Sequence, residues 1–313
     1  MTTRRTPGTA SLLDTRARAL RRYLPSAVAG DDRGVHQARV ASRRLREAVP
    51  VLSTGLKGSK AKKAGRKIRR LTRALGTVRE LDVTLGLLDE LATAEDLSRP
   101  ALQEVRLHVV AERDRLRKAM LTELATVDAE KLDRRLHSFS TALAADTTGA
   151  WRKALASRLL SRSRRLGAAI QTAGQLYVPE HLHQVRIAAK KLRYGLELAV
   201  DAGVAAAAAH VGTVKKAQTI LGRLHDLQIL QTHVAAVQAA PNARAGTDEA
   251  LAAIAGRIEE QCRLLHGKFV AAVPALRGLV TGVRADVAGR LTKGSQPLKM
   301  ALPRSRKRAG QAS

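Results

Sequence analysis

The sequence predicts an all-α fold, built from two antiparallel four-helix bundles that a pseudo-twofold axis relates. Three observations predict it. A helical motif occurs twice, a second pair of matched segments follows at nearly constant spacing, and no stretch shows the apolar alternation of a strand. The composition agrees, because 45% of the 313 residues are hydrophobic, mostly Ala, Leu and Val, which suit closely packed helices.

The repeated motif reads HQARVASRRLR at residues 36–46 and HQVRIAAKKLR at residues 183–193. Six of the eleven paired positions are identical, and the other five keep their chemical character. At about 100° per residue, apolar side chains fall on one face of each copy and basic side chains on the other. The residues expected to face the core are Ala38, Ala41, Leu45, Ala48 and Val49 in the first copy and Val185, Ala188, Leu192 and Leu196 in the second.

The outward faces of the two copies are basic and contain no acid before Glu47 and Glu197. A solvated helix face would normally include acids at i+4 to relieve repulsion. The whole chain has 56 Lys and Arg against 27 Asp and Glu, a net charge of +29, which favours a polyanionic partner. We therefore interpret these faces as binding surfaces. Their residues are His36, Arg39, Arg43 and Arg46, with Arg44 at one flank, and His183, Arg186, Lys190 and Arg193.

The first half of the chain is expected to form one repeat over residues 11–145. A capping box from Ser11 to Asp14 opens a helix that Pro25 should break, and Pro50 should kink or end the motif helix that starts near Gly34. The remaining expected helices run over residues 59–91, from Ser98 through Leu116, and over 133–143. The helix over 59–91 carries one basic stripe of Arg66, Arg69, Arg70 and Arg73.

The turn at residues 146–149 is the expected boundary with a second repeat over residues 150–290. Helices are expected from Trp151, after Pro179, and over 205–237 and 247–273, with a loop at 241–246. The first carries Arg158, Arg162 and Arg165 on one stripe. The second matched pair joins residues 75–82 to residues 221–228. Residues 1–10 are expected to be a flexible basic tail, and residues 291–313 a disordered one.

The paired motif helices, each followed by Leu-Gly-x-x-[Arg/His]-[acid], resemble the CHAD family, the conserved-histidine α-helical domain. The resemblance covers residues 11–290 and implies two four-helix units around a basic central surface, with inorganic polyphosphate as ligand. Carried over residue by residue, it implies polyphosphate contacts at His36, Arg39, Arg43, Arg44, Arg46, Arg69, Arg73, Arg79, His183, Arg186, Lys190, Lys191, Arg193, Lys215, Lys216 and His225. The basic stripe adds Arg66 and Arg70, and the second Leu-Gly segment adds Arg223.

The second repeat departs from the first in one respect. Gly212 and Thr219 stand opposite Arg66 and Arg73, so that side of the expected surface is less basic. The chemistry of the remaining cations still suits polyphosphate, which offers only anionic acceptor oxygens. Arg presents a rigid fork of donors to such oxygens, and Lys presents a point charge.

The expected function is non-enzymatic binding of polyphosphate. The alternative is a nucleic-acid-binding, chromatin-like protein, which the charge of +29 and the PRSRKRAG tail favour and the 2% aromatic content disfavours. A phosphohydrolase or phosphate-transfer enzyme is the weakest interpretation, because no glycine-rich phosphate loop, nucleophile elbow or Cys-His arrangement occurs. Glu80 and Asp226 are expected to orient the motif arginines.

No metal or cofactor is expected. The pair His181 and His183 lies among guanidinium groups, which disfavour a further cation, so each motif histidine is expected to bond a neighbouring helix or a phosphate. Cys262 is the only cysteine, which excludes a disulfide framework. No apolar run approaches the ~18 residues of a membrane helix. We expect a cytoplasmic protein without a membrane partner. If it binds polyphosphate in the cell, association with polyphosphate granules is also expected.

Overall fold

The computed structural model describes residues 8–76, 78–146, 148–240 and 247–293, and these residues form helices and no strands, which confirms the all-α fold class. No helix of this described part is both long and apolar enough to cross a membrane. In chain order the helices are α1 (Thr9–Val28), α2 (Asp32–Leu52), α3 (Lys60–Ala74), α4 (Val78–Leu91), α5 (Arg99–Ala125), α6 (Ala129–Ala144), α7 (Ala150–Ala173), α8 (Pro179–Asp201), α9 (Ala207–Gln238), α10 (Asp248–Gly282), the π-helical turn η1 (Val283–Ala288) and α11 (Gly289–Lys293).

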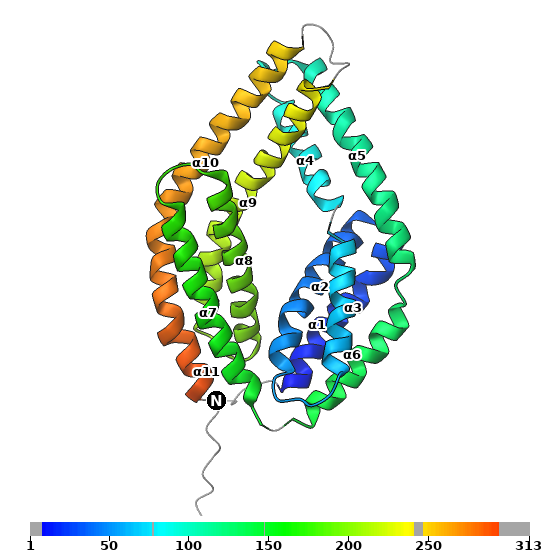
Figure 1. The fold of residues 1–313 in the computed structure, drawn as a ribbon, viewed down its shortest axis with the longest axis vertical. Helices are drawn as coiled ribbons and strands as arrows, with labels where there is room; N and C mark the ends of the chain where they lie inside the picture. Colours follow the sequence, from blue (N-terminus) through cyan, green and yellow to red (C-terminus); the bar gives the residue numbers. More distant parts are fainter. Residues whose placement is uncertain (1–7, 77, 147, 241–246, 294–313) are drawn as a thin grey trace, which may run out of the picture.

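The helices form two groups that lie side by side and meet at one end (Figure 1). One group holds α1, α2, α3 and α6, and the other holds α7 and α8 with the lower parts of α9 and α10. The upper parts of α9 and α10 continue beyond their group and pack against α4 and α5 at the tip of the molecule. The motif helices α2 and α8 pack on each other where the two groups face.

The buried apolar residues form two clusters, and both draw on helices from the two predicted repeats. The larger cluster, the base core, joins α1, α2, α3 and α6 to α7, α8 and parts of α9 and α10. The smaller cluster, the tip core, joins α4 and α5 to the remaining parts of α9 and α10. Helices from the two halves of the chain therefore pack on one another both at the base and at the tip of the molecule.

The motif helices bury the faces that their amphipathic pattern indicates. Leu45 on α2 and Leu192 on α8 are fully buried. Local signals also place several helix starts correctly. Asp31 Oδ2 accepts a hydrogen bond from Gly34 N at 2.6 Å to cap α2, and Ser98 Oγ accepts one from Ala101 N at 3.4 Å to cap α5. Pro179 occupies the first position of α8, as expected.

Three expected boundaries are wrong. Helix α1 begins at Thr9 without a side-chain cap, so Ser11 does not open it, and it continues through Pro25 to Val28. A proline near the end of a helix removes a single hydrogen bond, and apolar packing of the last turn offsets that loss. Ala27, beyond Pro25, is fully buried. Helix α10 likewise continues through Pro274, well past the expected end at Val273.

The long helix expected over residues 59–91 is two helices, because the chain breaks between α3 and α4. Arg39 of α2 donates through Nη1 to the carbonyl oxygens of Gly76, at 2.7 Å, and Leu75, at 3.4 Å. In α9 the matched segment continues without a break. The sequence after Gly76 contains β-branched Thr77 and Val78, whereas Gly222 is followed by Arg and Leu, which are better helix formers.

Several expected irregular segments lie outside the described residues. These are most of the two tails, at residues 1–7 and 294–313, and the loop at 241–246. The described chain is already helical at Thr9 and remains helical to Lys293. The turn between α2 and α3 is as expected from its glycines, since Gly55 and Gly58 have φ values of 93° and 99°.

We predict opposite effects of alanine at the two matched glycines. A Cβ at Gly76 would lie 2.9 Å from the carbonyl oxygen of Arg73 and 3.2 Å from Arg39 Nη1. Gly76→Ala should therefore lower the free energy of unfolding by about 1–3 kcal/mol. A Cβ at Gly222 meets nothing within 4 Å, so Gly222→Ala, the matched control, should raise it by roughly 0.5–1 kcal/mol. Urea unfolding measures both, and equal shifts would contradict the packing described at Gly76.

Candidate anion-binding site

The packing of α2 on α8 brings basic side chains from both copies of the motif together. Arg39 and Arg43 of α2 lie within electrostatic range of Arg186 and Lys190 of α8, and we call these four residues the central basic cluster. Each is partly buried. Within the described residues, no carboxylate lies within ion-pair distance of any of the four. Their positive charges therefore repel one another without direct compensation.

The electrostatic strain of the cluster appears in its pKa values. Burial, followed by the charges of Arg43 and Arg186, lowers the pKa of Lys190 to about 7. Burial and the charge of Arg43 lower the pKa of Arg39 to about 10, although Glu80 opposes this shift. Burial also lowers the pKa of Arg186. The structure thus holds desolvated cations close together, an arrangement that an anion would stabilise.

Two acids and one histidine from α4 and α9, together with His183 of α8, lie near the cluster. His225 Nε2 lies 3.3 Å from Glu80 Oε1, and the rings of His183 and His225 contact each other at an interplanar angle of 47°, with centroids 4.8 Å apart. The hydrogen bond to His225 is the main cause of a lowered pKa at Glu80, whereas burial raises the pKa of Asp226. Both acids attract the Arg186 guanidinium electrostatically, but neither forms an ion pair with it. The expected orientation of the motif arginines by these acids therefore does not involve a direct bond in this structure.

The first motif histidine does not bond a neighbouring helix through its buried ring nitrogen. His36 Nδ1 is buried and has no hydrogen-bond partner within the described residues. Burial, with the charges of Arg79 and Arg39, lowers the pKa of His36. The neutral imidazole can still donate one hydrogen bond, which an anionic oxygen at this position would accept.

Carboxylates at the ends of the motif helices hold the two copies together. Glu197 of α8 lies 3.3 Å from Arg44 Nε and 3.5 Å from Arg193 Nε. Glu47 of α2 accepts a hydrogen bond from Arg162 of α7 and lies 3.8 Å from Arg158. Arg44 and Arg193 are therefore partly committed to structural ion pairs. The sequence showed the two acids but not their partners.

Arg79 is half-buried near His36 and forms no ion pair within the described residues. The remaining predicted site residues fall into two sets. Arg223 forms a bidentate pair with Glu90 of α4, and Arg70 lies 3.5 Å from Glu123, so both link helices. The second set is exposed and forms no ion pair within the described part of the chain. Its members are Arg46, Arg66, Arg69, Arg73, Lys191, Lys215 and Lys216.

A polar cleft of about 560 Å³ between α2 and α7 was not predicted as a site. Its lining includes Arg158, Arg162, Arg165, Lys191 and the hydroxyl groups of Ser157 and Ser161. The three arginines form the stripe that the sequence shows on α7. Arg165 and Lys191 form no ion pair within the described residues, so the cleft contributes free positive charge next to the central basic cluster.

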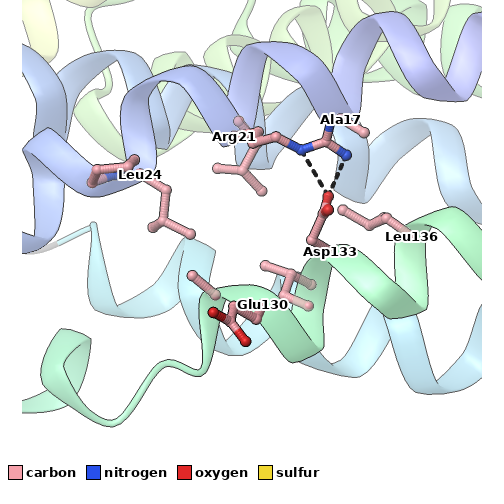
Figure 2. Close-up of a pocket in the computed structure, with 10 residues that line it drawn as sticks. Ala17, Arg21, Leu24, Glu130, Asp133 and Leu136 are labelled. Carbon is pink, nitrogen blue, oxygen red and sulfur yellow. Dashed lines mark hydrogen bonds and ion pairs between the residues drawn. The ribbon is translucent and has the colours of Figure 1, made fainter.

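A further pocket of about 220 Å³ lies between α1 and α6 and has a different character (Figure 2). Leu24 and Leu136 are part of its mainly apolar lining. The guanidinium of Arg21 bonds Asp133, with Nε 2.8 Å from Oδ1, so its charge is already compensated. This pocket is therefore unsuited to a polyanion.

Comparison with known proteins supports the architecture. The family model described as CHAD domain matches residues 11–235. The fold is similar to a crystal structure of the CHAD domain from the plant Ricinus communis, with a TM-score of 0.59 and 20% identity over 86% of this chain and 91% of that one. It is also similar to PptA from Streptomyces chartreusis, with a TM-score of 0.62 and 15% identity over 85% of this chain and 98% of that one. No curated protein matches significantly.

We predict that Lys190 destabilises the unliganded protein in a pH-dependent way. Its pKa is lowered from 10.5 to about 7, so the unfolded chain holds this proton more tightly. The destabilisation is complete below about pH 7 and disappears as the pH rises to 10.5. Lys190→Met should raise the free energy of unfolding at pH 6 by about 1–3 kcal/mol, a range discounted for partial exposure.

The gain from Lys190→Met should shrink as the pH rises towards 10. Urea unfolding across this pH range measures the difference between variant and wild type. Lys191→Met is the matched control, because it removes the same charge from the exposed neighbour outside the central basic cluster. A gain that does not vary with pH would contradict the assignment to the charge of Lys190.

Proposed function

The chain belongs to the CHAD domain family, and from this premise we propose that it binds inorganic polyphosphate without turning it over. The observation that carries the proposal is the central basic cluster. Arg39, Arg43, Arg186 and Lys190 converge from both motif copies and lack direct carboxylate partners among the described residues. A bound polyanion would supply the missing negative charge.

The chemistry of polyphosphate fits this cluster. The ligand is an extended chain with about one negative charge per phosphate and only acceptor oxygens, and the three arginines offer only donors. Binding should also raise the pKa of Lys190 again, because a nearby anion favours the charged amine. Phosphates in the cluster would therefore bind with uptake of a proton near neutral pH.

The cleft between α2 and α7 gives a long chain a second set of contacts. Lys190 belongs to the central basic cluster, and its neighbour Lys191 lines the cleft. A polyphosphate chain that crosses α8 at these two residues would reach Arg165 as well. We propose that short anions occupy the cluster alone and that long chains also use the cleft.

Nucleic acid is the second candidate, because the chain carries a net charge of +29. Such a charge supports sequence-independent contacts to phosphate groups. The 2% aromatic content offers few surfaces for stacked bases, which disfavours single strands and RNA. Polyphosphate needs no such surfaces.

We further propose that the protein acts in the cytoplasm and associates with polyphosphate granules.

We predict that long-chain polyphosphate binds more tightly than random duplex DNA. The two ligands should be titrated in competition at about 0.15 M salt, where the Debye length is about 8 Å and close contacts still count. Phosphate release should be followed in the same samples, with and without Mg²⁺, Mn²⁺ and Zn²⁺, and none is expected. Equal or tighter DNA binding would contradict the choice of ligand. Release that Glu80→Gln or Asp226→Asn abolishes would contradict the non-enzymatic function.

We also predict that both motif copies act on one ligand chain. If they do, contacts to the second copy are intramolecular and raise affinity by about 10²–10⁴ over one copy. Arg39→Ala/Arg43→Ala and Arg186→Ala/Lys190→Ala should each remove most of the affinity and lower the salt dependence. Isothermal titration gives affinity and stoichiometry for each variant.

The matched control removes the same charge elsewhere. Arg18→Ala/Arg22→Ala takes two exposed arginines at the same spacing from α1 and should change the affinity little. Circular dichroism checks that every variant keeps its helicity. Two independent sites would instead give half the stoichiometry at unchanged affinity, and that result would exclude a shared surface.

A further inference from the structure

A group of two histidines and one glutamate lies apart from the central basic cluster, where α5 meets α9. His108 and Glu112 are four residues apart on α5, so their side chains project from the same face of that helix. His233 reaches them from α9. One ligand atom from each of the three residues lies within 4.8 Å of the other two.

The existing contacts of this group are weak, and the rings of His108 and His233 pack at a tilt with centroids 5.6 Å apart. His233 Nδ1 lies 3.7 Å from Glu112 Oε2, which is too long for a hydrogen bond. Arg115 Nη2 lies 3.8 Å from Glu112 Oε1, but the side chain of Arg115 is 72% exposed, so the pair is weak. The nearby Arg113 pairs with its own neighbour Asp114 at 2.8 Å. The carboxylate of Glu112 is therefore available to another cation.

We propose that His108, Glu112 and His233 bind one divalent transition-metal ion of the zinc class. Two imidazoles and a carboxylate are a known ligand set for zinc, with bonds of about 2.0–2.2 Å. Tetrahedral ligand atoms at such bond lengths are about 3.3 Å apart. The three atoms would thus move closer by about 1.5 Å at most, which side-chain rotation can supply. A fourth position would stay open to water or another ligand.

The surroundings hold the three side chains in place. The His233 side chain is only 11% exposed. Val109 and Val234, each next in sequence to a ligand histidine, are buried in the tip core. The ligands therefore stand on packed helices, and a bound ion would link α5 to α9.

The test is a Zn²⁺ titration of the full chain, freed of metal with a chelator and measured by calorimetry without polyphosphate. The wild type should bind one Zn²⁺ per chain at this site. His108→Ala, Glu112→Gln and His233→Ala should each weaken that binding by about tenfold or more. Co²⁺ in place of Zn²⁺ should give visible absorption bands that the same variants lose. Zn²⁺ should also raise the melting temperature of the wild type more than that of the variants.

His137→Ala is the control for binding to surface histidines, since His137 is exposed on α6, and it should leave the titration unchanged. If His233→Ala fails to fold, Glu112→Gln and the exposed His108→Ala carry the test. The proposal is overturned if neither of them weakens Zn²⁺ binding. It is also overturned if the wild type binds Zn²⁺ no more tightly than the triple variant. Neither result would affect the polyphosphate proposal, which rests on other residues.

Discussion

Ion pairs between the two halves of the chain hold together helices whose charges repel. The motif helices α2 and α8 pack on each other although both carry rows of Arg and Lys. Glu47 binds Arg162 across the boundary between the halves, and Glu197 binds Arg44 across it in the other direction. Arg162 also donates to the carbonyl oxygen of Lys191 at 2.6 Å. These pairs act together with the apolar packing of the base core against the repulsion within the central basic cluster.

This arrangement explains why some motif cations are free and others are not. Arg44 and Arg193 share Glu197, and they stabilise the contact between the helices. Arg43 and Lys190 receive no carboxylate among the described residues. On the same two helices, some cations therefore form structural ion pairs, and others remain available to bind an anion. Stability and charge density are in tension at this surface, as is common at functional sites.

The amphipathic pattern predicted the motif helices and their buried faces well, because it depends on residues close together in the chain. Leu45 and Leu192 are buried as their spacing indicates. The break between α3 and α4 was missed, because β-branched Thr77 and Val78 are only a weak local signal and the contact from Arg39 that accompanies the break comes from far away in sequence. The cleft between α2 and α7 likewise depends on tertiary packing. The same reason applies to the group of His108, Glu112 and His233. No sequence motif joins these residues, and only the packing of α5 on α9 brings them together.

The composition of the tip core has a consequence for how the chain folds during synthesis. Its N-terminal members, among them Leu88 and Val105, are made long before their partners Leu230 and Ile254. At about 5–20 residues per second, the ribosome delivers those partners only after many seconds. The nascent first half therefore emerges with an apolar face uncovered, and contacts of such high sequence separation close late. A chain truncated after its first half would keep that face exposed and would tend to aggregate.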